Sequence, residues 1–376
     1  MKLAPFNYVP LWSPRVWNGM EAYDFGKLLR EYRYKVHGSR MPSACVLMFA
    51  TGMPSIVNRL QSLLYGRKVR ATEMVADPIF IIGHWRSGTT LVHELLSLDD
   101  QFASPSTFQC FMPRGFLVTH WWLRQLTSRL LPERRPMDNM PLGWDVPQED
   151  EFAMLSMGMP TSYRRMAFPN ENPRHLDYLN MHGVPFLERQ RWKEALREFV
   201  LCLNYYYGRQ IVLKSPPHTG RISILQEIFP DAKFIHICRS PFDFIPSTMH
   251  MWAALDSANG FQLPDHKGLE QYVFDSYDRL YRGFFRDRGL LNPQNHIQVQ
   301  FEDLARRPVE TMARVYESLG FEEFDYVEPL LRDYEREHKD YRRNRHEVPD
   351  ALRDRIAHAC DQYIREFGFA HEMAAA

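Results

Sequence analysis

The stretch that decides the fold is "DPIFIIGHWRSGTTLVHELLSLDD", residues 77–100. An apolar run typical of a β-strand, "IFIIG", precedes the loop "HWRSG" and then "TTLVHELLSL", whose leucines have the spacing of an amphipathic helix. Gly83, four further residues and Gly88 have the spacing of a nucleotide-phosphate loop. However, Thr89 and Thr90 stand where a nucleoside triphosphatase has Lys and then Ser or Thr. The sequence therefore predicts an anion-binding loop at a helix N-terminus, for a ligand that does not need that lysine.

The residue types in this loop suit a phosphate group. Backbone N–H groups around Ser87 and Gly88 would converge on an anion, and the hydroxyls of Thr89 and Thr90 would add donors. Arg86 would place a forked cation inside the loop. The lysine of a nucleoside triphosphatase serves the β- and γ-phosphates, and the hydroxyl after it holds magnesium. Without that lysine, we expect a donor that has no γ-phosphate and no obligatory metal; the alternative is an ordinary strand-to-helix turn.

Three further apolar runs predict strands: "RQIVLK" ending at Lys214, "AKFIHICR" ending at Arg239 and "NHIQVQFE" ending at Glu302. Each run is followed by turn residues and a helical segment. This alternation predicts a three-layer α/β/α fold, with a central parallel sheet covered by helices on both faces. Ligands bind beyond the carboxyl ends of the strands in such sheets. We therefore expect Gly83, Lys214 and Arg239 at one common edge.

The chain divides into three regions. We expect an N-terminal helical extension over 1–76, an α/β domain over 77–320 with a largely helical insertion at about 101–207, and a C-terminal helical segment over 321–376. The insertion is rich in Pro, Trp and Met, and its length suits an acceptor-binding lid, with structural decoration as the alternative. The charged run "EREHKDYRRNRHEV", residues 335–348, predicts a solvated helix face, and the alternative is a basic loop that closes over the ligand.

Composition excludes several classes of protein. Lys plus Arg and Asp plus Glu both total 46, so no overall charge would draw the chain to nucleic acid or to an anionic membrane, and any anion site must be local. The five cysteines have no C-x-x-C spacing and the histidines no metal-ligand spacing, so we expect neither a disulfide framework nor a bound metal. The N-terminus lacks a signal-peptide core and no apolar run approaches a membrane span, so we expect a cytoplasmic protein. Residues 42–70 have apolar side chains at helical spacing and a basic end; we favour a helix packed on the domain over a peripheral membrane contact.

A second motif begins at residue 238, "CRSPFDFIPSTMHMW". A helix that begins near Pro241 would put Ser247 about two turns in, while Arg239 stays at the end of the preceding strand. The two side chains could then grip a second phosphate. Pro246 removes a helix N–H, and we expect it to be tolerated only in the first turn.

Together, "RSGTT" and the pattern R-x-P-x-D-x-x-x-S resemble the two signatures of sulfotransferases that use 3′-phosphoadenosine 5′-phosphosulfate. The resemblance covers about residues 78–308, including "FEDLARRP" after the last strand. It implies that no metal is needed. Cytosolic members of the family carry Lys where Arg86 stands, so the chain looks closer to the bacterial and carbohydrate-directed groups. The resemblance also assigns the 5′-phosphosulfate to Arg86, Ser87, Gly88, Thr89 and Thr90, and the 3′-phosphate to Arg239 and Ser247.

Sulfuryl transfer needs a cation near the bridging oxygen and a base for the acceptor hydroxyl. Lys214, in "VLKSPPHTGR", is the candidate cation, because related sulfotransferases have a lysine in similar contexts; a surface lysine is the alternative. The cluster of Glu149, Asp150 and Glu151 is expected to raise the affinity of its carboxylates for protons, as a base requires, and a solvated helix N-terminus is the alternative. His218 titrates near neutrality without tuning. Cytosolic family members use a histidine and sugar- or tyrosine-directed members a glutamate, so we favour Glu149, with Glu151 and His218 as alternatives.

The resemblance implies an enzyme that transfers a sulfuryl group to a hydroxyl of a small-molecule, lipid or glycan acceptor. The aromatic-rich insertion favours an acceptor with apolar or ring surfaces. Two alternatives belong to other classes. An ATP-dependent small-molecule kinase with a degenerate loop would require magnesium and a substitute for the lysine. A non-catalytic nucleotide-binding protein on a membrane surface would use residues 42–70.

Overall fold

The computed structural model describes residues 6–7, 9, 13–132, 134–138, 140, 142–338 and 348–372. Most of the charged run at 335–348 is therefore outside the described residues, and both interpretations of it stay predictions. The α-helices of the described residues are α1 (Ala22–Glu31), α2 (Met41–Ala50), α3 (Gly52–Arg70), α4 (Thr89–Leu96), α5 (Thr107–Phe111), α6 (Phe116–Thr119), α7 (Leu123–Thr127), α8 (Asp150–Ser156), α9 (Phe186–Tyr207), α10 (Ile222–Ile228), α11 (Pro241–Asn259), α12 (Leu269–Asp287), α13 (Phe301–Arg306), α14 (Pro308–Leu319), α15 (Phe324–Glu337), α16 (Asp350–Ala359) and α17 (Asp361–Glu366).

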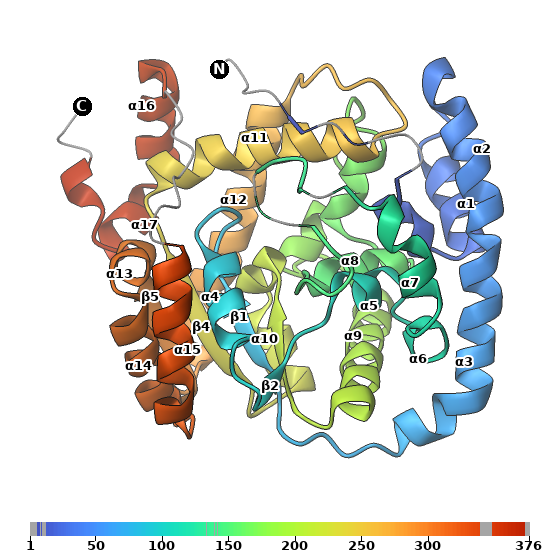
Figure 1. Cartoon of the computed structure of the whole chain (residues 1–376). Coiled ribbons are helices and arrows are strands. Elements are labelled where there is room, and N and C mark those ends of the chain that lie inside the picture. The colour runs from blue at the N-terminus through green and yellow to red at the C-terminus, as the bar shows by residue number, and fades with distance from the viewer. Residues whose placement is uncertain are drawn as a thin grey trace.

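A five-stranded parallel sheet forms the centre of the fold, in the order β2-β3-β1-β4-β5 (Figure 1). Four of its strands are the predicted ones: β1 (Ile79–Ile82), β3 (Gln210–Lys214), β4 (Lys233–Cys238) and β5 (His296–Gln300). The fifth, β2 (Phe102–Ala103), lies inside the region predicted as a largely helical insertion. Two residues are too short for a periodic pattern, so this edge strand forms because β3 offers it a partner.

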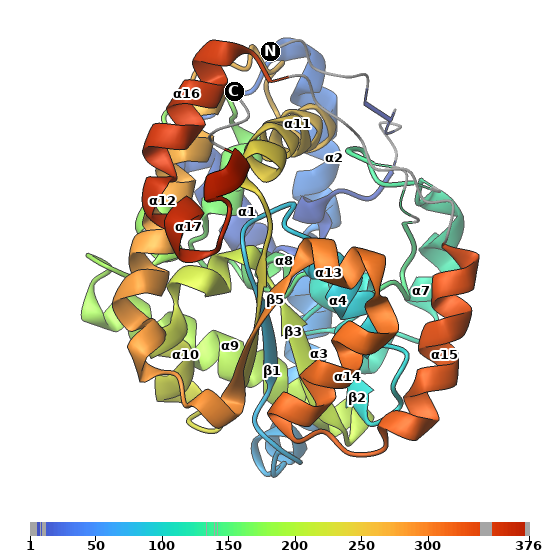
Figure 2. The same ribbon diagram turned by 90° about the vertical axis from the view of Figure 1, so that its left-hand side faces the viewer.

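Side chains alternate along the central strand between two apolar cores. Ile79 and Ile81 of β1 face a core shared with α4 and α14. Phe80 and Ile82 face a larger core shared with α9 and α12. A strand buried on both faces needs an unbroken apolar run, which explains why "IFII" has no polar residue. The three-layer α/β/α prediction is therefore confirmed, and Figure 2 shows the helices on the two sides of the sheet.

Helix α11 carries the second motif and begins at Pro241, as predicted. Ser240 is its N-cap and Ser247 lies in its second turn. Pro246 is also in the second turn, so the expectation that it would be tolerated only in the first turn is wrong. The helix continues to Asn259, although proline has no N–H to donate to the carbonyl of Phe242. Burial of most of this helix in the larger core offsets the missing hydrogen bond.

Helices α2 and α3 follow each other closely and lie along one side of the molecule (Figure 1). The stretch Gly38–Arg70 is long and apolar enough to cross a membrane by length and composition, which differs from the sequence-based expectation of no such run. Ser, Asn and Gln interrupt the apolar residues, but few charged residues do. The stretch packs on the domain by one side, as expected: the backbone N–H of Leu117 donates to Gln61 Oε1 at 2.8 Å, and α3 contacts α6 and α9.

Candidate active site

The loop between β1 and α4 turns tightly at its two glycines. Gly83 has φ 146° and Gly88 has φ 104°, both in the region that favours glycine. A Cβ on Gly88 would lie 2.2 Å from the ring of Phe301, so no larger residue fits there without movement. Arg86, between them, also has a positive φ of 66°. A non-glycine residue in this conformation is uncommon and clusters at functional loops.

The loop presents backbone donors at the start of α4. Ser87 Oγ donates to the carbonyl of His84 at 2.7 Å, so this hydroxyl stabilises the turn itself. The hydroxyl of Thr219 accepts from the N–H of Gly83 at 2.7 Å and anchors the loop to the segment after β3. Among the described residues, none accepts from the backbone N–H of Gly88, Thr89 or Thr90. These donors, at the positive end of the helix dipole, can bind an anion.

The two motifs meet at the carboxyl edge of the sheet. Arg86 Nε donates to Ser247 Oγ at 3.0 Å. Arg239 Nη1 donates to the backbone carbonyl of Arg86 at 3.0 Å, and its guanidinium lies 4.6 Å from the centre of the Phe301 ring. The predicted proximity of Arg239 and Ser247 is therefore present, through Arg86. Two guanidinium groups and a hydroxyl at one site can hold phosphate oxygens.

One acidic side chain that no motif singled out also lies here. Asp138 Oδ2 accepts from Arg86 Nη1 at 2.8 Å, and the Asp138 side chain is only 2% exposed. Burial alone would raise the pKa of the Asp138 carboxyl, but Arg135 and Arg86 outweigh burial and hold that pKa below its ordinary value. The Asp138 side chain is therefore a carboxylate anion beside the loop between β1 and α4, and it orients the Arg86 guanidinium.

Three consecutive carboxylates bind three basic side chains at the end of β3 and in the segment that follows it. Lys214 Nζ donates to Glu149 Oε1 at 2.8 Å. His218 belongs to the 3-10 helix Pro216–Gly220, and its Nε2 lies 2.6 Å from Asp150 Oδ2. Arg221 forms a bidentate pair with Glu151, at 2.6 and 3.0 Å, and the Thr161 hydroxyl also contacts Glu151. Each of the three carboxylates therefore has its own basic partner.

This arrangement changes the expectation about proton affinity. Burial alone would raise the pKa of Asp150, but His218 and a hydrogen bond from Ser215 hold that pKa below its ordinary value of 3.8. The expected rise in proton affinity from clustering is therefore wrong for Asp150, because its partners favour the charged form.

The three base candidates differ in exposure. The side chains of Glu151 and His218 are completely buried, and Glu151 is held by Arg221 and His218 by Asp150. Glu149 is the N-cap residue of α8, and its side chain is 14% exposed. The side chain of its partner Lys214 is 3% exposed.

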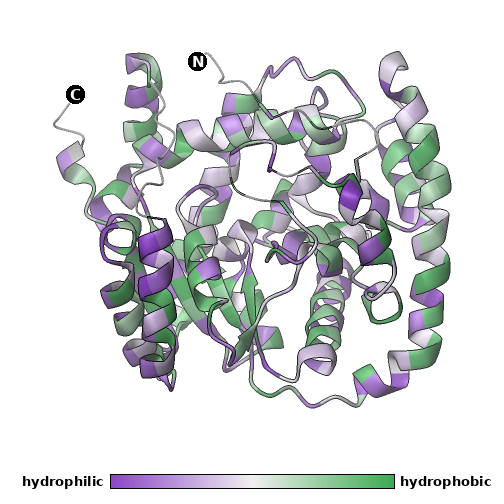
Figure 3. Ribbon diagram, in the orientation of Figure 1, coloured by the Kyte–Doolittle hydropathy of each residue, from purple (hydrophilic) through white to green (hydrophobic). Residues whose placement is uncertain are grey.

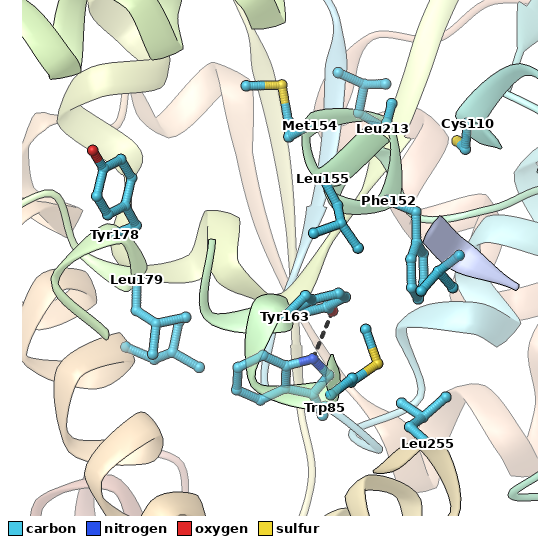
Figure 4. Close-up of a cluster of buried hydrophobic side chains, with 14 of the residues drawn as sticks. Trp85, Cys110, Phe152, Met154, Leu155, Tyr163, Tyr178, Leu179, Leu213 and Leu255 are labelled. Carbon is cyan, nitrogen blue, oxygen red and sulfur yellow. Dashed lines mark hydrogen bonds between the residues drawn. The ribbon is translucent and has the colours of Figure 1, made fainter. Parts of the chain in front are cut away.

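A hydrogen-bonded chain connects Glu149 to the loop after β1. Tyr163 Oη donates to Glu149 Oε2 at 2.5 Å and accepts from Trp85 Nε1 at 2.8 Å. Figure 4 shows the Trp85–Tyr163 bond among buried apolar side chains. Burial, with the nearby carboxylates, raises the pKa of Tyr163 well above its ordinary range, so the hydroxyl keeps its proton and acts as a donor.

Sequence reasoning found the residues of both motifs, Lys214 and the carboxylate cluster, and the structure places them at the carboxyl edge of the sheet. Arg86, Ser247 and Arg239 lie together, and Lys214 lies with Glu149. Sequence reasoning missed Trp85, Tyr163 and Asp138. Trp85 stands inside the quoted loop, but no local pattern marks Tyr163 or Asp138, since they bond to Trp85 and Arg86, which lie far away in the chain.

Known proteins resemble this chain in sequence and in structure. Residues 78–326 match the model of a family described as "Sulfotransferase family". Over 358 residues the chain is 36% identical to the omega-hydroxy-beta-dihydromenaquinone-9 sulfotransferase Stf3 of Mycobacterium bovis and to that of Mycobacterium tuberculosis, covering 95% of this chain and 92% of each relative.

Two crystal structures share the fold. Sulfotransferase STF9 from Mycobacterium avium has a TM-score of 0.74 at 19% identity, covering 96% of this chain and 93% of that one. Sulfotransferase STF1 from Mycobacterium tuberculosis has a TM-score of 0.59 at 18% identity, with 85% and 88% covered. The family match, which spans more than half of the chain, and the 36% identity to Stf3 over nearly its full length show that this protein belongs to the sulfotransferase family.

Proposed function

We propose that this sulfotransferase moves a sulfuryl group from 3′-phosphoadenosine 5′-phosphosulfate to the hydroxyl of an omega-hydroxylated dihydromenaquinone, with Glu149 as the base. The family in general uses this donor. The proposed acceptor follows from the relatives at 36% identity, whose name specifies omega-hydroxy-beta-dihydromenaquinone-9. That acceptor is apolar and carries a ring system, as the aromatic-rich insertion favours.

One observation carries the proposal: the hydrogen-bonded chain from Trp85 through Tyr163 to Glu149 and Lys214. It ties a carboxylate and an ammonium to the anion-binding loop that contains Trp85. A base, a cation and a phosphate site in fixed relation are the elements that in-line transfer requires.

The chain's residues divide the donor between them. The N–H groups at the start of α4 and the Arg86 guanidinium would hold the 5′-phosphosulfate, with Thr89 and Thr90 as further donors. Arg239 and Ser247 would hold the 3′-phosphate. The contribution of Ser87 would come from its backbone, because its hydroxyl donates to the turn.

In the transfer step, the acceptor oxygen forms a bond to sulfur while the bond between sulfur and the bridging phosphate oxygen breaks. Glu149 accepts the acceptor's hydroxyl proton, and Lys214 donates to the oxygen that leaves with the phosphate. An ammonium has three N–H donors, so Lys214 can keep Glu149 while it donates to the leaving oxygen. The products are a sulfate ester and adenosine 3′,5′-bisphosphate. Glu149 is favoured as the base because the competing side chains of Glu151 and His218 are completely buried.

A thermal-shift titration with adenosine 3′,5′-bisphosphate tests the donor assignment, because a ligand that binds the native state raises the melting temperature. The proposal predicts a shift with the bisphosphate that is insensitive to a metal chelator, and a smaller one with ATP plus magnesium. A shift with ATP and magnesium alone would overturn the donor assignment and favour a kinase with Arg86 in place of the missing lysine.

A further inference from the structure

Helices α2 and α3 have an apolar side that faces away from the domain. Among their most exposed apolar side chains are Phe49 and Leu63, each 84% exposed, and Ile56, 71% exposed. Figure 3 shows apolar residues along both helices at the outer side of the molecule. In the most apolar 18 consecutive residues of Gly38–Arg70, only 28% are buried. Contiguous exposed apolar side chains of this kind mark an interaction surface.

The exposed residues follow the helical period. On α3, Ile56, Leu60, Leu63 and Leu64 recur at intervals that place them on one side of the helix. The buried residues Val57 and Gln61 lie on the adjoining side of the helix, which packs against α6. These four leucine and isoleucine side chains, together with Val46 and Phe49 of α2, make up what we name the α2–α3 face.

The charged residues of the stretch that carries this face are all basic, while Glu21, Glu194 and Glu198 line the hollow beside Arg59 and Arg70. Residues 38–70 contain Arg40, Arg59, Arg67, Lys68 and Arg70 and no Asp or Glu. Within the described part of the chain, no acidic side chain forms an ion pair with Arg59, Arg67, Lys68 or Arg70. An apolar helix face bordered by basic side chains is complementary to the acyl chains and anionic headgroups of a bilayer surface.

We propose that the α2–α3 face docks on the surface of an anionic lipid bilayer, with both helices in the plane of the interface. The helices do not cross the bilayer, because their other side is bound to the domain: Asn58 Nδ2 donates to Glu21 Oε1 at 3.0 Å, and the N–H of Leu117 donates to Gln61. A spanning helix would have to expose these polar groups to hydrocarbon, which is unfavourable.

Docking also gives a lipid acceptor a short way to the site; this part rests on the proposed function. Helix α3 packs on α6, which follows α5 closely in the chain, and α5 packs on α8, which begins directly after Glu149. Docking would therefore place the bilayer beside the elements that lead to Glu149, and an apolar acceptor would have a short distance to travel between the bilayer and the site.

Vesicle flotation of the purified full chain tests docking without any need for activity. We expect binding to vesicles of phosphatidylcholine with phosphatidylglycerol, weaker binding to phosphatidylcholine alone, and release at high salt. The variant Phe49→Ser/Leu63→Ser should lose roughly tenfold or more in partitioning. Arg67→Gln/Lys68→Gln should lose roughly fivefold for each charge removed. The control Tyr326→Ser/Leu330→Ser, which replaces exposed side chains of α15 on the far side of the molecule, should bind as the wild type does.

Several results would overturn docking. These are no flotation of the wild type, equal flotation of the Phe49→Ser/Leu63→Ser variant, or membrane association that only detergent reverses, which would indicate a span. A self-associating chain whose dimer is lost in this variant, with no lipid binding, would make the face a contact between two copies. Unchanged bisphosphate shifts in the variants show intact folding and donor binding. If the wild type binds vesicles but adenosine 3′,5′-bisphosphate does not raise its melting temperature, only the proposed function is contradicted. If the bisphosphate raises the melting temperature but the wild type does not bind vesicles, only docking is contradicted.

Discussion

The hydroxyl of Tyr163 offers a sharp test of how the site is held together, through the substitution Tyr163→Phe. The side chain is 1% exposed, and its hydroxyl makes two hydrogen bonds, from Trp85 Nε1 and to Glu149 Oε2. Phenylalanine keeps the ring in place, so no large cavity forms. The bond to the carboxylate contributes about 1.5–3 kcal/mol and the neutral bond about 0.5–1.5 kcal/mol, so we expect a loss of roughly 2–4.5 kcal/mol in the free energy of unfolding.

The same change should reduce turnover through Glu149, which loses the donor that orients it. General base catalysis contributes about 100-fold to 10,000-fold, and a misplaced base forfeits part of that, so we expect kcat to fall roughly 10-fold to 100-fold. The KM for the donor should stay unchanged, because the hydrogen bonds of the Tyr163 hydroxyl within the described part of the chain go to Trp85 and Glu149 and to none of the side chains that would hold phosphate. Urea unfolding and steady-state sulfotransfer kinetics measure the two effects.

A matched control is Tyr272→Phe. Tyr272 is equally buried, and its hydroxyl donates to the carbonyl of Ser162 at 3.5 Å, away from Glu149. This variant should lose stability without a change in kcat. A Tyr163→Phe enzyme that is folded and turns over within about twofold of the wild type would refute the argument that Tyr163 orients the base.

The remaining predictions concern the donor site and the buried pairs. Arg239→Ala should weaken binding of adenosine 3′,5′-bisphosphate by an order of magnitude or more, since a charge-assisted hydrogen bond contributes about 1.5–3 kcal/mol. Calorimetry measures the affinity, with Arg282→Ala on the surface as the control. An unchanged affinity of the Arg239→Ala variant would contradict the assignment of Arg239 to the 3′-phosphate. The pKa of Asp150 is lowered on folding, so its stabilisation is complete above the ordinary value of 3.8 and is lost as the pH falls through the lowered pKa. Asp150→Asn should therefore be less stable than the wild type at neutral pH, with a smaller further loss in acid; urea unfolding at several pH values that gave parallel curves would argue against this.

Local sequence patterns were enough for the layers of the fold and for the tight loop between β1 and α4. The run "IFII" is apolar throughout because β1 is buried on both faces, and Gly83 and Gly88 mark the turns that only glycine makes easily. The start of α11 at Pro241 follows from the fixed φ of proline. These features depend on neighbours in the chain, and they could be predicted for that reason.

Contacts between distant segments decided what the sequence could not show. The three carboxylates, Lys214 and His218 were singled out from the sequence, but Arg221 was not, and nothing local says that each carboxylate pairs with one basic residue in the same order. Strand β2 depends on the edge of β3, and the Tyr163 hydroxyl accepts a hydrogen bond from Trp85, which lies 78 residues away. Proline in the second turn of α11 is tolerated because of packing, which propensity does not include.

The most direct test follows labelled sulfate from 3′-phosphoadenosine 5′-phosphosulfate to an omega-hydroxylated dihydromenaquinone, with the wild type and with Glu149→Gln. The account predicts that the wild type forms the sulfate ester in the presence of a chelator. The Glu149→Gln enzyme should bind adenosine 3′,5′-bisphosphate normally and transfer roughly 100-fold more slowly or worse. A Glu149→Gln enzyme that transfers sulfate at the wild-type rate, or a wild type that binds the bisphosphate and leaves this acceptor unmodified, would contradict the account.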